Sequence, residues 1–193
     1  MYKRQFDAKK KSEKVLVGVA FNFLLVMLFV LPVDLLFQHL TRGENSLLLY
    51  QQFLTWVLYV IQSSLGIEVY IRGENSTILA YADIIDMEIV AECSGLHETV
   101  FLSLLVLCFR GVKPMVRAKW AIYAAIFIFV ENLIRILSGY YLINIYDFST
   151  WDKFHYFWWH TGQYALIMGV FVLWVMTIAG MPENKSVKKN FIR

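Results

Sequence analysis

The first long apolar run of the chain reads VLVGVAFNFLLVMLFVLPVDLLF over residues 15–37. A helix of about 20 apolar residues is long enough to cross the hydrocarbon core of a bilayer. A removable signal peptide would have a shorter apolar segment and a small-residue cleavage site, and this run has neither. We therefore predict a retained membrane-spanning helix that follows a mobile, basic tail over residues 1–14.

Three further apolar runs follow, at about residues 95–110, 119–141 and 154–178. The chain is 59% hydrophobic and only 17% charged, which is too apolar for a soluble domain of 193 residues. The sequence therefore predicts an all-α polytopic membrane protein, with about four transmembrane helices in a single membrane domain over residues 15–180.

The basic residues predict the orientation in the membrane. Beyond the N-terminal tail they cluster in the C-terminal tail, residues 181–193, and in the loop between the second and third spans, at Arg110, Lys113, Arg117 and Lys119. The positive-inside rule places these segments in the cytoplasm, so we expect a multi-pass protein of the plasma (inner) membrane. Because the basic residues are placed for topology and the net charge is only +3, nucleic acid is not expected as a partner.

The region between the first two spans must then cross the membrane an even number of times. Residues 47–65 form a more polar helix, which could be a polar span or an interfacial helix. The simplest topology leaves this helix on or in the outer leaflet. If it does cross, either a second crossing lies nearby or one of the basic clusters is on the other side of the membrane. Residues 67–90 alternate apolar and polar side chains around the turn sequence of residues 73–76, which predicts a small extracytoplasmic hairpin.

Polar side chains from three different spans are expected at the outer face. Cys93 precedes the second span, Arg135 lies near the outer end of the third, and His155 is at the start of the fourth. A thiol at a helix N-terminus has a lowered pKa and is reactive as the thiolate. A charge within an apolar span is costly and is therefore a functional candidate. We predict a cysteine-dependent active site; the alternatives are simple packing for Cys93 and an ion pair with Glu131 for Arg135.

The residues alone leave the choice of histidine open. His160 is closer to the expected depth of Cys93, whereas His155 is at the helix start, where a water-exposed base can exchange protons. His97, one turn after Cys93, is a third candidate.

The second cysteine, Cys108, lies in an apolar stretch where packing explains it. It is 15 residues from Cys93, or about 22 Å along a helix, so no disulfide can join the two. No paired Cys/His spacing of the kind that closes a structural zinc site occurs.

Two motifs carry a family resemblance over about residues 60–178. The sequences Glu-Cys-Ser-Gly-Leu at 92–96 and Asn-Leu-Ile-Arg-Ile at 132–136, followed by a histidine at the start of a final helix, resemble the exosortase/archaeosortase family of membrane-embedded cysteine transpeptidases. In that family the histidine is commonly followed four residues later by Gly or Trp. His155 and Trp159 fit this pattern, which slightly favours His155 over His160.

The resemblance implies a processing enzyme for exported proteins that end in a sorting signal, which consists of a motif, a transmembrane helix and a basic tail. Cys93 would attack a backbone carbonyl at the outer face of the membrane to form a thioester, and a membrane-lipid or envelope acceptor, or water, would resolve it. A histidine would act as base and then acid, and Arg135 would stabilise the oxyanion. We expect Asn132, Glu92 and Ser94 to contribute to substrate binding. The resemblance implies that neither a metal nor an organic cofactor is needed.

Two other functions are compatible with the residues. A transporter or accessory membrane subunit would use Arg135, Glu131 and the histidines as a polar relay. A membrane acyltransferase would use Cys93 as a covalent acyl carrier.

A separate conjecture is that the 67–90 hairpin holds the sorting motif of the substrate as an extra strand.

Overall fold

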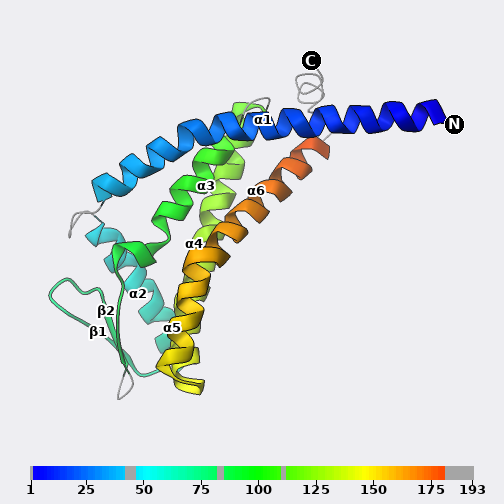
Figure 1. Cartoon of the computed structure of the whole chain (residues 1–193). Helices are drawn as coiled ribbons and strands as arrows, with labels where there is room; N and C mark the ends of the chain where they lie inside the picture. Colours follow the sequence, from blue (N-terminus) through cyan, green and yellow to red (C-terminus); the bar gives the residue numbers. More distant parts are fainter. Residues whose placement is uncertain (1, 42–46, 82–84, 110–111, 181–193) are drawn as a thin grey trace.

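The computed structural model describes residues 2–41, 47–81, 85–109 and 112–180 (Figure 1). Its elements in chain order are α1 (Tyr2–Thr41), α2 (Leu48–Ser64), β1 (Val69–Arg72), β2 (Ile78–Tyr81), β3 (Ile85–Glu88), the 3₁₀ turn η1 (Ala91–Ser94), α3 (Leu96–Cys108), α4 (Pro114–Ile145), α5 (Phe148–Phe157), the π-helical turn η2 (Trp158–Gly162) and α6 (Gln163–Gly180).

Among the described residues, three helical segments are long and apolar enough to cross a membrane: Phe23–Thr41 within α1, Pro114–Ile145, which is α4, and Phe148–Ile178, which α5, η2 and α6 form together. The second predicted span corresponds to α3, an apolar helix of 13 residues that extends about 20 Å at the rise of an α-helix. Large apolar side chains are exposed on the outward faces of these helices, for example Leu28, Ile122 and Leu173. Such exposure fits contact with lipid. The prediction of an all-α polytopic membrane protein is thus confirmed.

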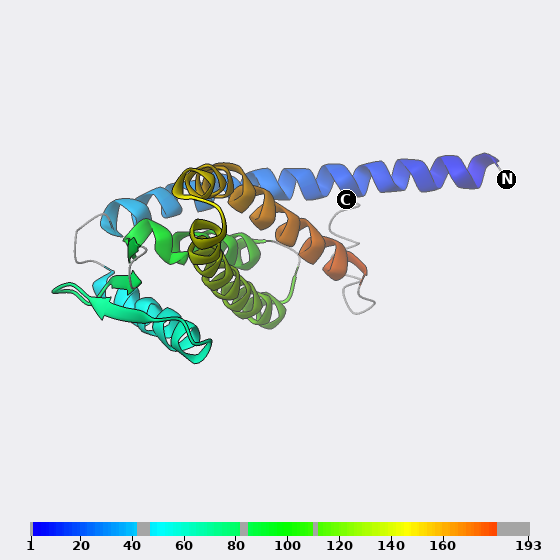
Figure 2. The ribbon, with the colours of Figure 1, turned by 90° about the horizontal axis from the view of Figure 1, so that it is seen from below.

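The N-terminal segment differs from the prediction of a mobile tail. α1 begins at Tyr2 and continues without interruption through Pro32 to Thr41. The lysines, alanine and glutamate of the basic segment are good helix formers, which explains how the helix extends beyond the apolar run. Figure 2 shows the N-terminal part of α1 extending past the other helices.

The helices pack around an apolar core, in which α3 contacts α1, α4 and α6. Arg117 closes the C-terminal end of α3, because its Nη1 donates to the carbonyl oxygens of Leu107 and Phe109. Buried members of the apolar core are Val26, Val30, Leu102, Leu105, Val106, Phe109, Val112, Ala121, Ala124, Ile128, Ile167, Phe171, Trp174 and Ile178.

A second core lies between α2, the sheet and the second half of α4. We call it the mixed core, because polar side chains are buried beside its apolar members, which are Leu54, Leu58, Val69, Leu79, Tyr81, Ile89 and Ile136. The Gln62 amide and the Tyr81 hydroxyl exchange two hydrogen bonds of 2.8 and 3.0 Å, and Gln51 donates to the carbonyl of Ile89. The polar side of α2 therefore faces the protein.

The extended region contains one strand more than the predicted hairpin. β1, β2 and β3 form an antiparallel sheet in the order β1-β2-β3, with Val69 opposite Tyr81 and Ile78 opposite Glu88. β3 leads directly into η1 and α3, so the sheet determines where the segment around Cys93 begins.

Candidate active site

Cys93 lies in η1, a short 3₁₀ turn that is closed by its own hydrogen bonds. The amide of Cys93 donates to the carbonyl of Val90, and the buried Ser94 hydroxyl donates to the carbonyl of Ala91. The same hydroxyl accepts a bond from the amide of Leu96. Ser94, predicted to bind substrate, thus uses its hydroxyl to hold the cysteine turn in place.

The structure corrects the predicted environment of the thiol. Cys93 is not in the first turn of α3, because Gly95 adopts a left-handed conformation (φ 71°) between η1 and α3. Burial raises the pKa of the Cys93 thiol above its ordinary value, and the positive charge of Arg135 opposes this effect. The thiol is therefore protonated near neutral pH and requires a base to become a nucleophile.

Gly95 also allows α4 to approach the cysteine turn closely. A Cβ atom at residue 95 would lie 2.8 Å from Cγ of Asn132, closer than side-chain carbons pack. In the space left open, the Asn132 amide donates a 2.9 Å hydrogen bond to the carbonyl of Ser94. Asn132 is 1% exposed. Its position indicates that it joins α4 to the turn rather than being open to solvent.

Arg135 lies one turn further along α4 and is 5% exposed. Its Nη2 donates to the side-chain oxygen of Asn132 and, at 3.3 Å, to the carbonyl of Cys93. Within the described residues its Nε and Nη1 are buried without a hydrogen-bond partner. Unused donors on a buried cation are costly. Their presence beside a thiol indicates a site prepared for an acceptor atom.

The alternative of an ion pair between Arg135 and Glu131 is not what the structure contains. The carboxylate of Glu131 accepts hydrogen bonds from the indole of Trp158, at 2.9 Å, and from the amide of Gln163, at 3.3 Å. It therefore holds the final helix against α4. Glu98 in α3 is near enough to Arg135 to interact with its charge.

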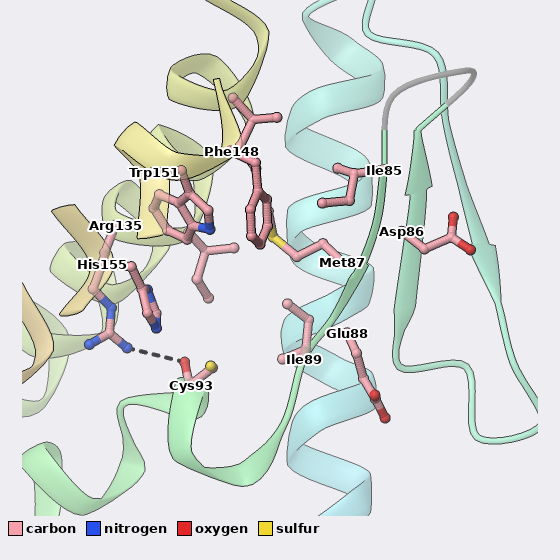
Figure 3. Close-up of a pocket in the computed structure, with 12 residues that line it drawn as sticks. Ile85, Asp86, Met87, Glu88, Ile89, Cys93, Arg135, Phe148, Trp151 and His155 are labelled. Atoms are coloured by element: carbon pink, nitrogen blue, oxygen red, sulfur yellow. Dashed lines mark hydrogen bonds between the residues drawn. The ribbon is translucent and has the colours of Figure 1, made fainter. Parts of the chain in front are cut away.

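His155 comes to this site from α5. Its side chain points toward Cys93 in Figure 3 and packs against Trp151, with ring centroids 4.8 Å apart. Within the described residues its buried Nδ1 has no hydrogen-bond partner. Gly139 of α4 makes room for Trp151, because a Cβ there would lie 2.8 Å from the indole ring.

The thiol, guanidinium and imidazole line one cleft of about 230 Å³. Its other walls come from β3, the second half of α4 and the start of α5, and include Ile85, Asp86, Met87, Glu88, Ile89, Ile136, Ile143, Phe148 and Trp151. These wall residues were not predicted from the sequence. The spacing of Trp151, four residues before His155 on a helix, is the one signal that could have found any of them.

The other candidate residues lie elsewhere. His160 is exposed in η2, stacked on Tyr156 with its Nδ1 3.0 Å from the Tyr156 carbonyl. His97 packs edge-on against Phe37 of α1. Glu92 is exposed in the cysteine turn but does not line the cleft.

Chemically, the cleft combines a thiol, a fixed cation, and imidazole and guanidinium nitrogens that have no hydrogen-bond partner in the described part of the chain. This set can transfer a proton from sulfur to imidazole and stabilise a negative oxygen that forms beside the sulfur. Among the described residues, no group of three His, Cys, Asp or Glu side chains could hold a metal ion.

The fold and the site define a polytopic membrane protein with a cysteine-containing cleft at one end of its helix bundle. A family model described as transmembrane exosortase matches residues 14–178, which is most of the chain. The chain belongs to the transmembrane exosortase family. No curated protein and no solved structure matches the sequence.

Proposed function

We propose that the protein is a membrane cysteine transpeptidase that cleaves the C-terminal sorting signals of exported proteins through a thioester intermediate. The observation that carries this proposal is the convergence of Cys93, Arg135 and His155, from three different elements, on one cleft (Figure 3). Membership of the exosortase family supports the same class of reaction.

In the first half-reaction, Cys93 attacks the carbonyl carbon of the scissile peptide bond. The new S–C bond forms as the thiol proton moves to His155, and the carbonyl oxygen becomes an oxyanion. Nε and Nη1 of Arg135 are the donors available to that oxyanion. When the intermediate collapses, the C–N bond breaks, His155 returns the proton to the departing amine, and the tail helix is released.

In the second half-reaction, a hydroxyl group of a membrane lipid or envelope acceptor, or a water molecule, attacks the thioester. His155 removes the proton of the attacking hydroxyl, a new C–O bond forms and the S–C bond breaks. The proton then returns to the sulfur, which restores the resting thiol. The raised pKa of Cys93 is consistent with a cycle that begins and ends with the protonated form.

We propose that the cleft faces the outside of the plasma (inner) membrane. The basic loop at the start of α4, which includes Lys113, Arg117 and Lys119, is then cytoplasmic, and α5 is outside. α2 fits the outer leaflet in this orientation. Its buried face includes three polar side chains, Gln51, Thr55 and Gln62, beside two leucines. Its exposed face carries Leu49 and Trp56, 83% and 56% exposed, which suits contact with lipid more than with water.

The direct test uses a tagged exported protein from the source cell that ends in a C-terminal sorting signal. It is co-expressed with the wild-type chain, with Cys93→Ala and with the matched control Cys108→Ala. We expect the tail to be removed by the wild type and the control, and to be retained with Cys93→Ala. Tail removal that persists in Cys93→Ala cells would eliminate the mechanism.

The orientation has its own test in intact cells. A membrane-impermeant thiol reagent should label Cys93, whereas a Lys113→Cys variant, in a background without Cys93 and Cys108, should be labelled only after the membrane is permeabilised. Labelling of Lys113→Cys from the outside would reverse the proposed orientation.

A further inference from the structure

β3 is an edge strand, and its open side belongs to the cleft. It pairs only with β2 in the described sheet. Residues 85–89 all line the cleft, whereas no described residue of β1 or β2 does so. The side of β3 that lies away from β2 is therefore next to the thiol, guanidinium and imidazole.

The hydrogen-bonding pattern shows which backbone groups face that side. The amide of Ile89 donates to the carbonyl of Thr77 at 2.9 Å, and the register places Met87 opposite Leu79. In an antiparallel pair, every second residue bonds to the partner strand and the residues between point their amide and carbonyl groups away. Since Ile89 bonds to the β2 side, Asp86 and Glu88 direct these groups to the open edge.

The open edge leads to the reacting atoms. Ile85 lies beside Phe148 at one end of the cleft, and Cys93 and Arg135 lie at the other (Figure 3). β3 runs from the first end to the second, and four residues separate its last residue, Glu88, from Cys93. A peptide lying along this edge is thus led to the thiol.

We propose that the open edge of β3 binds the part of the sorting signal that precedes the scissile bond, as a fourth strand parallel to β3. This inference rests on the proposed function. The substrate chain passes from its exported domain into its own membrane helix, and so runs toward the bilayer. β3 has the same direction, because it continues through the cysteine turn into α3.

The pairing also defines what kind of segment fits. The amide and carbonyl groups of Asp86 and Glu88 bond to the substrate backbone whatever its sequence, so selectivity comes from side chains. Substrate side chains on the inner face of the extended sheet meet Met87, Phe148 and Trp151. Those on the outer face lie beside the exposed carboxylates of Asp86 and Glu88. The substrate class is therefore an extended segment with apolar side chains at alternate positions.

The backbone contact is tested with Glu88→Pro and its matched control Glu88→Ala. Proline removes the amide donor at the open edge, where an edge strand tolerates it, and alanine removes only the side chain. With the tagged sorting-signal protein as substrate, we expect KM to be about tenfold higher for Glu88→Pro than for Glu88→Ala, because only the proline variant lacks the amide donor. Iodoacetamide should alkylate Cys93 at the same rate in the two variants. Equal KM values for the two variants would overturn the proposal.

The direction of the bound substrate strand, and the sheet edge that it pairs with, are tested by disulfide trapping in a chain without Cys93 and Cys108. Single cysteines replace Asp86, Glu88 or, as the far-edge control in β1, Ile71, and single cysteines are placed along the sorting signal. Pairing in parallel predicts that the substrate position trapped by residue 86 lies about two residues N-terminal to the position trapped by residue 88. The reverse order, or trapping by residue 71 alone, would contradict it. If the wild type does not remove the tail, the proposed function itself fails, which separates the two outcomes.

Discussion

The two cores of the molecule differ in the polarity of the side chains that they bury. In the apolar core between α1, α3, α4 and α6, the buried side chains are apolar and include Leu102, Leu105 and Ile128, each 0% exposed. In the mixed core and the cysteine turn beside it, Gln62, Thr55 and Ser94 are equally buried but are hydrogen-bonded within the protein.

This difference corresponds to two roles, because one region stabilises the fold and the other holds the reactive groups. Apolar packing supplies stability without defining any reactive geometry. Buried polar groups cost free energy unless they are paired. Among the described residues with buried, unpartnered polar atoms, Arg135 and His155 are the two that line the cleft, which identifies them as groups left for a substrate. Variants in the apolar core should therefore lose stability, whereas variants around the cysteine turn should lose turnover.

The largest expected effect is at His155. Replacement by Ala removes the base and acid of the proposed cycle, so turnover of the sorting-signal protein should fall by about 10³-fold. The exposed His160→Ala is the matched control and should retain turnover within about twofold. A larger loss of turnover for His160→Ala than for His155→Ala would show that His160, and not His155, is the base.

Arg135→Gln should reduce turnover by about 10²-fold or more, because it removes the fixed charge and most of the free donors available to the oxyanion. Glutamine keeps a polar side chain beside Asn132, which limits the structural damage. The rate constant for the first, tail-releasing step is the quantity to measure. An unchanged value would exclude Arg135 from oxyanion stabilisation.

The pH dependence of Cys93 alkylation gives a smaller effect. Because burial raises the pKa of this thiol, the thiolate fraction should increase about tenfold per pH unit across the neutral range. Iodoacetamide labelling of Cys108→Ala should therefore rise steadily from pH 6 to pH 8 without reaching a plateau. A plateau below pH 7 would show a preformed thiolate and contradict the need for a base.

Gly139→Ala tests how the histidine is positioned. The added methyl group would meet the ring of Trp151, which packs against His155, so both side chains must shift. We expect turnover to fall about tenfold at saturating substrate, since displacement of a catalytic group by about 1 Å costs rate. Gly169→Ala on α6 is the control, because nothing lies within 4 Å of a Cβ at that residue. Equal turnover of the two variants would remove Trp151 from this role.

The smallest effect on chemistry is expected in the apolar core. Leu105→Ala should lower the free energy of unfolding by about 2–5 kcal/mol, because it leaves a cavity in close-packed apolar surroundings. Turnover per folded molecule should stay within about twofold of the wild type. Thermal unfolding in detergent and turnover normalised to folded protein measure the two quantities, and a selective loss of turnover would show that the two cores are coupled.

Much of the fold could be predicted from the sequence. The apolar runs identified α1, α4 and the final helix, because a segment of that length and composition has few stable environments other than a bilayer. The polar helix at 47–65 was found at Leu48–Ser64. The third strand was missed because only residues 82–84 separate β2 from β3, so the two strands were predicted as one extended stretch.

The site was predicted in part. Residue type and expected depth in the membrane identified Cys93, Arg135 and the two histidines as candidates. Depth does not determine in which direction a side chain points from its helix. The rotation of α5 about its axis decides that His155 enters the cleft and that His160 does not. The thiol pKa was predicted in the wrong direction, since the sequence does not reveal that Cys93 is partly buried or that Gly95 separates it from α3.

The sequence by itself determined a membrane protein with a few polar residues near one face, because hydropathy and charge act through local composition. Only the tertiary structure decided which of those residues meet, which donors stay unpaired and which strand edge borders the thiol. These depend on distances between segments far apart along the chain, and helix packing and strand pairing set such distances.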